Sequence, residues 1–341
     1  GEIFRRYNLP IQCSALGRSI TSGGWERSFN SSSEGKSVTF GILGYFSSNF
    51  LLMYTELMKF DISAVILTMG DRPEALKDSI NSIRMQEDSD VEVIVVWNGI
   101  SPDQSIDAEI HIHSDVNVGI PSGRNLGASK ASGGLILFLD DDARLLDPEL
   151  LDKVQETFDA DKSIAITSLR IIDEDGLTAR RHIPRLGSKS GAISGETTSF
   201  LGGACVARKS ALDQVGGYSA DLFYSMEETD LSWRILNAGW KIFYAADLQV
   251  EHPRTEPTRH SEAIYLTFRN RIWITKANLP LILIPIYILT WLGITVARNL
   301  SSAKALLAIF KGFISGLSSS PLKRSPLSWK TVEVQRLSQS F

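Results

Sequence analysis

Cysteine is scarce in this chain, whose 341 residues include only Cys13 and Cys205, far apart in the sequence. Two thiols cannot form a disulfide framework, and no C-x-x-C pair is present to suggest a zinc site. This cysteine usage fits a reducing compartment best. The chain also lacks a basic surplus, because its 39 acidic residues outnumber its 35 lysines and arginines. Nucleic-acid-binding proteins usually carry such a surplus, so the composition argues against nucleic acid as a partner.

The residues that are present indicate a globular main domain between two unusual ends. The chain is 43% apolar and 22% charged, which is typical of a globular protein. Residues 1–36 are rich in serine and glycine, and we expect residues 1–60 to form an N-terminal extension, partly loop or disordered. From Arg298 to Phe341, seven basic residues stand against one acid, Glu333. We therefore expect a main domain over residues 61–265, then apolar helices and a basic tail over residues 266–341.

Alternating strand and helix patterns predict an α/β fold. Apolar runs at residues 63–68, 91–97, 135–139 and 164–169 have the length of buried strands. Helical spacing follows Pro73, and a further helix is expected from residue 148 to about residue 158. This alternation predicts a mainly parallel, Rossmann-like sheet with helices on both faces. Ligands of such sheets bind beyond the carboxyl ends of the strands, which makes Asn98 and Asp140–Asp142 candidate site residues.

Three consecutive acids, Asp140, Asp141 and Asp142, come directly after the apolar run 135–139. Neighbouring carboxylates repel one another, and an unpaired charge is costly to bury, so acids at a buried strand end favour a bound cation. Carboxylate oxygens suit Mg²⁺ or Mn²⁺, which also bind phosphate oxygens. A solvated turn before a helix at Pro148 explains the same acids equally well, because short acidic runs are common on surfaces.

Six motifs between Asp61 and about residue 260 carry a family resemblance. In order they are Val65-Ile66-Leu67-Thr68 to Arg72-Pro73-Glu74, Val95-Val96-Trp97-Asn98-Gly99, Asn117-Val118-Gly119-Ile120 with Arg124-Asn125-Leu126-Gly127, the three aspartates, Gly202-Gly203, and Glu227–Arg234 followed by His252. This stretch resembles family 2 glycosyltransferases of the membrane-associated bacterial type, which share the GT-A fold. Each motif alone is weak, but six in the same order make a specific match.

The resemblance implies binding roles for the matching residues. A nucleotide-sugar donor would be bound by Thr68, Arg72, Asn98, Gly119, Arg124, Asn125, Asp140 and Asp141. A metal ion, Mn²⁺ or Mg²⁺, would be bound by Asp140, Asp142 and His252, although a lone histidine is as often an ordinary surface or core residue. The acceptor side would include Gly202, Gly203 and Trp233. Family members usually have aspartate where this chain has Trp97 or Asn98, which leaves the nucleotide open.

The acidic helix implies the catalytic residues. In the family pattern the second acid of a pair is the general base, which points to Glu228. Glu227 matches the first acid and is an alternative base, and Asp230 would cap or brace the site. Acids at the start of a helix are also stabilised by the helix dipole, which is the simpler explanation for any one of them.

Together these roles imply a metal-dependent, inverting glycosyltransferase. It would move a sugar from a nucleoside diphosphate to a hydroxyl of a lipid-linked or cell-envelope glycan. One alternative is a non-catalytic protein that binds nucleotide sugars or glycans on the same fold. Another is a nucleotidyltransferase, which should have a glycine-rich loop after the first strand, whereas residues 68–72 contain one glycine, Gly70.

The C-terminal region predicts contact with a membrane. Residues 279–297 are nineteen residues without a charge, just long enough to span a bilayer, for which about twenty are needed. Basic residues flank this run on both sides, which disfavours a single span. We expect peripheral, monotopic or re-entrant attachment to an anionic, cytoplasmic membrane face, helped by a second apolar piece at residues 306–317. A buried helix of the main domain is the alternative, and self-association is left open.

Overall fold

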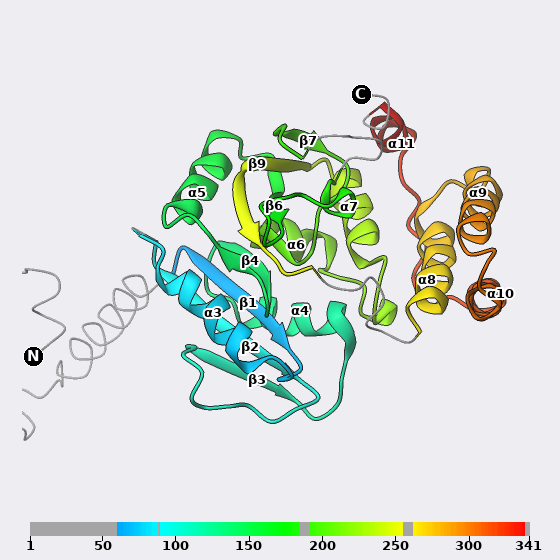
Figure 1. Ribbon diagram of the computed structural model, residues 1–341. Coiled ribbons are helices and arrows are strands. Elements are labelled where there is room, and N and C mark those ends of the chain that lie inside the picture. The colour runs from blue at the N-terminus through cyan, green and yellow to red at the C-terminus, as the bar shows by residue number, and fades with distance from the viewer. Residues whose placement is uncertain (1–59, 88, 185–190, 255–261, 338–341) are drawn as a thin grey trace, which may run out of the picture. The chain divides into compact units, whose positions relative to one another are not determined.

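The computed structural model describes residues 60–87, 89–184, 191–254 and 262–337. All of them belong to one compact unit, Leu57–Phe341. The expectations for the N-terminal extension, for the apolar residues 38–58 and for Cys13 lie outside the described residues. Figure 1 shows the described elements, with the sheet at the centre and helices α8 to α11 following it in the chain.

The described strands form one nine-stranded sheet in the order β3-β2-β1-β4-β8-β6-β9-β5, and β7 pairs with β9. Their bounds are β1 Ile62–Thr68, β2 Val91–Asn98, β3 Ile110–Ser114, β4 Leu135–Asp140, β5 Arg144–Leu145, β6 Ile164–Ile172, β7 Gly195–Thr197, β8 Ala204–Arg208 and β9 Lys241–Glu251. The strands expected at 63–68, 91–97, 135–139 and 164–169 are confirmed as β1, β2, β4 and β6.

The expectation of a mainly parallel sheet is wrong for half of the strand pairs. Strands β1 to β4 pair in parallel, as do β6 and β9, but β8 runs antiparallel to both β4 and β6. Short strands β5 and β7 are also antiparallel to β9. Adjacent parallel strands need a crossover connection, usually a helix, whereas β8 follows β6 through a long loop region and so can pair with it in the antiparallel direction.

Helices cover both faces of the sheet. Their bounds are α3 Pro73–Arg84, α4 Gly119–Lys130, α5 Leu150–Ala160, α6 Lys209–Val215, α7 Glu227–Asn237, α8 Ala263–Asn278, α9 Leu283–Arg298, α10 Ala303–Ser318 and α11 Trp329–Leu337. Residues alternate along β1, so Ile62 and Ile66 pack with α3 and α5, while Val65 packs with α4, α6 and α7. The rigid sheet therefore fixes the strand ends where the candidate acids lie.

Helix α8 lies between the sheet domain and the two apolar helices α9 and α10 (Figure 1). Its Trp273 packs with Trp233 of α7 in an apolar cluster. On its other side α10 approaches closely, because a Cβ at Gly312 would lie 2.7 Å from the Tyr265 carbonyl oxygen. After α10 the chain returns to α8, where the Leu327 amide donates to the Asn278 carbonyl at 2.7 Å. None of the helices in the described ranges is long and apolar enough to cross a membrane.

Candidate active site

The ends of β4 and β9 bring three candidate metal ligands together. Strand β4 ends at Asp140, and β9 ends at Glu251, held there by its pairing with β5. His252 follows directly, with its Nε2 atom 3.2 Å from Asp142 Oδ1 and 3.6 Å from Asp140 Oδ2. One ligand atom from each residue lies within 4.8 Å of the others. The fold thus unites residues that are more than one hundred positions apart.

The chemistry of this cluster fits a divalent cation. The Nδ1 atom of His252 lies 2.9 Å from the Pro253 carbonyl oxygen, and a proton donated there leaves Nε2 as the ligand atom. Burial alone would raise the pKa of Asp140, but the His252 contact and the Arg124 charge lower it to about 2. Asp140 is therefore ionised at neutral pH. Two carboxylates and one imidazole are a donor set that Mn²⁺ accepts, and Mg²⁺ also binds carboxylates.

The middle acid, Asp141, is held by residues that follow β1. The Thr68 hydroxyl donates to Asp141 Oδ2 at 2.7 Å, and Arg72 Nη2 lies 2.5 Å from Asp141 Oδ1. Arg72 also forms an ion pair with Asp142. Burial raises the pKa of Asp141, while these contacts oppose the rise. The predicted donor-binding residues Thr68 and Arg72 thus lie beside the acids.

Arg124 links the metal cluster to the acidic helix α7. Its Nη2 atom is 3.4 Å from Asp140 Oδ1, and its Nη1 atom is 3.6 Å from Glu228 Oε1. Glycines make this approach possible, since a Cβ at Gly202 would lie 2.2 Å from Arg124 Nη1. A Cβ at Gly203 would lie 2.2 Å from Asp140 Oδ2. The predicted acceptor-side glycines therefore make room for the acids and Arg124.

The two glutamates at the start of α7 differ in environment. Glu227 is 3% exposed, and its Oε2 atom has no hydrogen-bond partner within the described ranges. Burial and the neighbouring charge of Glu228 raise the pKa of Glu227 to about 8, so Glu227 keeps its proton at neutral pH. The Glu228 side chain is 30% exposed beside Arg124. Of the two, only Glu228 is accessible to an incoming group.

Asp230 is enclosed by structural partners. It accepts hydrogen bonds from Ser219 Oγ at 2.7 Å and from Asn278 Nδ2 at 2.8 Å, and it pairs with Arg234 at 2.7 Å. These contacts match the bracing role rather than proton transfer. Trp233 is also buried, with its ring 5.7 Å from that of Tyr287 on α9. Its predicted contact with the acceptor gains no support from this position.

Three predicted donor-binding residues organise turns around α4. Asn98 Oδ1 accepts from the Val118 amide at 2.8 Å, and Asn98 Nδ2 donates to Asn117 Oδ1 at 2.9 Å. Gly119, with φ of 81°, begins α4. Asn125 exchanges two hydrogen bonds with the backbone of Tyr218. Their predicted contacts with a nucleotide stay predictions.

Sequence reasoning missed a basic cavity beside the metal cluster. This cavity of about 410 Å³ is lined by Asp173, Ala179, Arg180, Arg181, His182, His252, Pro253 and Arg254. The rings of His182 and His252 lie 6.1 Å apart. Burial and the charge of Arg181 lower the pKa of His182 to about 4, so this ring is neutral at pH 7. The signal in the sequence was the Arg180-Arg181-His182 run inside a long polar loop.

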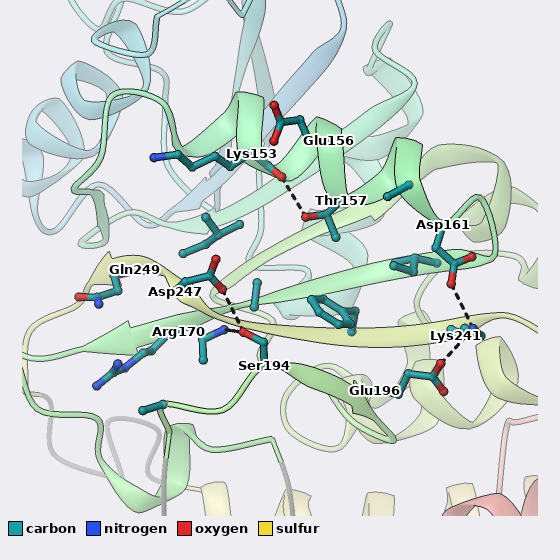
Figure 2. Close-up of a pocket in the computed structure, with 17 residues that line it drawn as sticks. Lys153, Glu156, Thr157, Asp161, Arg170, Ser194, Glu196, Lys241, Asp247 and Gln249 are labelled. Atoms are coloured by element: carbon teal, nitrogen blue, oxygen red, sulfur yellow. Dashed lines mark hydrogen bonds and ion pairs between the residues drawn. The ribbon is translucent and has the colours of Figure 1, made fainter.

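A second cavity, of about 840 Å³, lies between α5, β6 and β9, and Asp140, Asp142 and Glu228 do not line it. Figure 2 shows its charged residues, among which Lys241 pairs with Asp161 at 3.1 Å and with Glu196 at 2.9 Å. None of the predicted site residues lines this cavity. We therefore assign the candidate active site to the strand ends.

Comparisons with known proteins identify an enzyme family that part of the chain resembles. Residues 63–216 match the family described as Glycosyl transferase family 2. An N-acetylglucosaminyl-diphospho-decaprenol L-rhamnosyltransferase of Mycobacterium tuberculosis is 34% identical over 73 residues, which cover 21% of this chain and 24% of the relative. A pre-mycofactocin glycosyltransferase of the same organism is 26% identical over 206 residues, or 55% and 42% of the two chains. The chain thus spans less than half the length of the curated relatives it matches.

Solved structures share the fold at low identity. The structure of S. aureus TarS 1-349 in complex with UDP-GlcNAc matches with a TM-score of 0.54 and 15% identity, covering 76% of this chain and 82% of that chain. The structure of GalNAc-T7 with UDP, GalNAc and Mn²⁺ matches with a TM-score of 0.51 and 15% identity, covering 64% and 48%. These matches support a mixed α/β sheet of the GT-A type, flanked by helices.

Proposed function

Because residues 63–216 match the family described as Glycosyl transferase family 2, we propose that the chain transfers a sugar from a nucleoside diphosphate to an acceptor hydroxyl with inversion. The observation that carries this proposal is the cluster of Asp140, Asp142 and His252, joined through Arg124 to Glu228. A protein that only bound nucleotide sugars would bind the donor without turning it over. A nucleotidyltransferase finds no support in the family match.

The proposed mechanism uses the side chains at the strand ends. A divalent cation held by Asp140, Asp142 and His252 would neutralise the charge that builds on the departing diphosphate. Glu228 accepts the proton of the acceptor hydroxyl as its oxygen attacks the anomeric carbon. The bond to the diphosphate breaks, and the diphosphate leaves with the bonding electrons. A single displacement of this kind inverts the anomeric configuration.

The proposed cation is Mn²⁺ in preference to Mg²⁺. One ligand of the three is an imidazole nitrogen, which suits transition metals, whereas Mg²⁺ favours oxygen ligands. The structure of GalNAc-T7 contains Mn²⁺ together with UDP, according to its description. We further propose a lipid-linked or cell-envelope glycan as acceptor, because the name of the rhamnosyltransferase relative contains a diphospho-decaprenol carrier.

A donor should reveal itself by thermal stabilisation. A ligand at one hundred times its Kd stabilises a protein by about 2.7 kcal/mol, which corresponds to roughly 5–10 °C in Tm for a domain of this size. In a panel of UDP-, GDP- and dTDP-sugars with Mn²⁺, we expect one donor to raise Tm by this amount. The same sugars without Mn²⁺, and the free sugars, serve as controls. The panel is repeated with Mg²⁺, and if no nucleotide sugar raises Tm with either metal, the proposed function is contradicted.

We also propose that the chain docks on an anionic membrane through α9 and α10. These helices and their flanks expose large apolar side chains, namely Leu281, Ile282, Ile286, Leu289, Leu300, Leu307, Phe310, Ile314 and Leu317. On α10 the exposed residues recur at helical spacing and form one face. The opposite face of α10 is buried against α8 through Ile309 and two glycines. A helix with one packed face and one exposed apolar face suits an interfacial position.

Charge favours lipid over another apolar partner. Residues 263–332 contain four arginines and five lysines but no acidic residue. Lys304 and Lys311 are exposed on the helix that carries the apolar face. Basic residues beside apolar ones attract anionic headgroups, and the cytoplasmic face of a membrane carries them. We therefore propose the cytoplasmic membrane surface as the location of the enzyme.

Vesicle sedimentation tests the docking surface. The full chain should pellet with phosphatidylglycerol-containing vesicles and less with phosphatidylcholine alone. Leu307→Asp combined with Phe310→Asp should weaken binding at least about 10²-fold, because two inserted apolar side chains are lost and each contributes about 1.5–3 kcal/mol. Lys304→Gln with Lys311→Gln should weaken only the binding to anionic vesicles, at about 1 kcal/mol per residue.

Point substitutions are the right variants because the segment after α10 hydrogen-bonds to α8. Removal of residues 279–341 would strip those bonds and the ring contact of Trp233 with Tyr287. Ile193→Asp changes an equally exposed residue elsewhere and should leave binding unchanged. A wild-type chain that stays in the supernatant with both kinds of vesicle would refute the docking surface.

A further inference from the structure

The segment before α7 has an unusual backbone. Phe223, Ser225 and Met226 have φ angles of 62°, 69° and 72°, and they are the non-glycine residues with positive φ among those that the structure describes. Side chains with a Cβ rarely adopt this conformation, so surrounding contacts must hold it. Met226 is the residue that caps the start of α7. The backbone conformation of residues 222–226 therefore determines where α7 begins and where its first two residues, Glu227 and Glu228, lie.

Asn270 of α8 binds this segment from one side. Its Nδ2 atom lies within hydrogen-bond distance of the carbonyl oxygens of Leu222 at 2.8 Å, Tyr224 at 2.9 Å and Ser225 at 2.9 Å. Because the amide has two N–H groups, one of them is shared between two of these carbonyls. Its Oδ1 atom accepts from Arg269 Nη2 at 2.8 Å, which fixes the orientation of the amide. Asn270 is 0% exposed. One buried amide thus contacts three carbonyl groups of the strained segment.

Helix α4 holds the same segment from the opposite side. The Ile120 amide donates to the Phe223 carbonyl oxygen at 2.8 Å. No side chain fits at Gly119, because a Cβ there would lie 2.3 Å from that oxygen. A further bond from α8 runs from Thr267 Oγ1 to Ser225 Oγ at 2.9 Å. The segment is fixed between the two helices.

We propose that Asn270 is a positioning residue for Glu228, an inference that rests on the proposed transferase function. Asn270 does not reach the reacting groups, but it holds the segment that sets the first turn of α7. That turn places Glu228 Oε1 3.6 Å from Arg124, which also contacts the metal ligand Asp140. Misplacement of a catalytic group by about 1 Å can lower the rate by about 10²-fold.

The test compares catalysis with donor binding in the full chain. Asn270→Ala should lower kcat by about 10²-fold, while the donor Kd measured by calorimetry with Mn²⁺ should change by less than about threefold. Ser225→Gly in the Asn270→Ala background should restore part of kcat, because glycine accepts positive φ without strain. Ser225→Gly alone loses the hydrogen bond from Thr267 but also relieves the backbone strain at residue 225, so it should lower kcat no more than Thr267→Val does.

Two further variants separate positioning from general stability. Ser63→Ala removes a buried hydroxyl that donates to Glu92 at 2.6 Å, at the opposite end of β1. It should lower Tm and leave kcat unchanged. Thr267→Val removes one contact to the segment with little change in volume, and it replaces Asn270→Ala if that variant fails to fold. It should lower kcat less, with donor affinity again unchanged.

The inference is overturned if kcat of Asn270→Ala, or of Thr267→Val where that variant replaces it, stays within about twofold of the wild type, or if donor affinity falls in step with kcat. Hydrogen exchange gives a readout that does not depend on transfer. Exchange of amides 222–230 should increase in Asn270→Ala and not in Ser63→Ala, and equal exchange in both would also overturn the inference. A wild type without turnover but with this exchange difference would count against the transferase proposal alone.

Discussion

Glu228→Gln is expected to lower kcat by about 10²–10⁴-fold, because it removes the proposed proton acceptor while keeping the shape of the side chain. Glu228 is the accessible acid of its pair and lies beside Arg124. Donor affinity should be nearly unchanged, since the metal cluster, Thr68 and Arg72 are intact. Steady-state kinetics and calorimetric donor binding in the presence of Mn²⁺ measure the two effects separately.

Glu227→Gln is the matched comparison. Glu227 has a pKa raised by burial to about 8 from the ordinary value of 4.5, so the glutamine mimics its neutral form, and kcat should fall less. The native state keeps this proton between those pH values while the unfolded chain loses it, so the wild type loses stability as pH rises through that window. Glu227→Gln should therefore raise Tm at pH 8 and leave it unchanged at pH 4. An active Glu228→Gln enzyme beside an inactive, donor-binding Glu227→Gln enzyme would move the base to Glu227.

Loss of the metal is expected to have a comparable effect. Asp142→Asn removes one of the three ligands and should lower kcat by about 10³-fold, because a bound metal ion supplies several kcal/mol of charge stabilisation in the transition state. Excess EDTA should act on the wild type in the same way, and added Mn²⁺ should reverse it. Titration calorimetry with Mn²⁺ alone checks the loss of binding. Full activity in excess EDTA would refute the metal site.

A glycine pair provides a steric version of this experiment. Gly203→Ala adds a methyl group where Asp140 Oδ2 would lie 2.2 Å away, so Asp140 must move and Mn²⁺ binding should weaken. Gly134→Ala adds the same methyl group where nothing lies within 4 Å. The second variant should bind Mn²⁺ like the wild type. Equal Mn²⁺ affinity in both variants would contradict the placement of Asp140 in the metal site.

Strand ends were the part of the site that could be predicted from sequence. Short apolar runs identify β1, β2 and β4, and the residues that follow parallel strands meet at one edge, as Thr68 and Asp141 do. The position of His252 needed the family resemblance, because the pairing of β5 with β9 brings it to the acids. No local pattern predicts that pairing. A strand was expected after Gly203, but the antiparallel direction of β8 was missed for the same reason.

The burial of the side chains on α7 could be predicted only partly from the sequence. Glu227 lies four residues before the buried Leu231 and so shares its helix face, which indicates burial, whereas Glu228 is turned by about 100° from it. The contact between Asp230 and Asn278 spans 48 positions, and Asn270 is 45 to 48 positions from the carbonyls it binds. Such contacts depend on how α8 packs, which sequence spacing does not encode.

The return of the chain from α10 to α8 has a consequence for substrate choice. Helices α9 and α10 leave the catalytic unit at Leu279 and rejoin it where the Ser325 and Leu327 amides bond to the carbonyls of Ala277 and Asn278. This helical pair is therefore attached to the catalytic unit at both of its ends, not by a single flexible linker. If the α9–α10 pair rests on lipid as proposed, the distance of Glu228 from the bilayer surface is constant. The enzyme would then select acceptor hydroxyls by their distance from the membrane surface as well as by their chemistry.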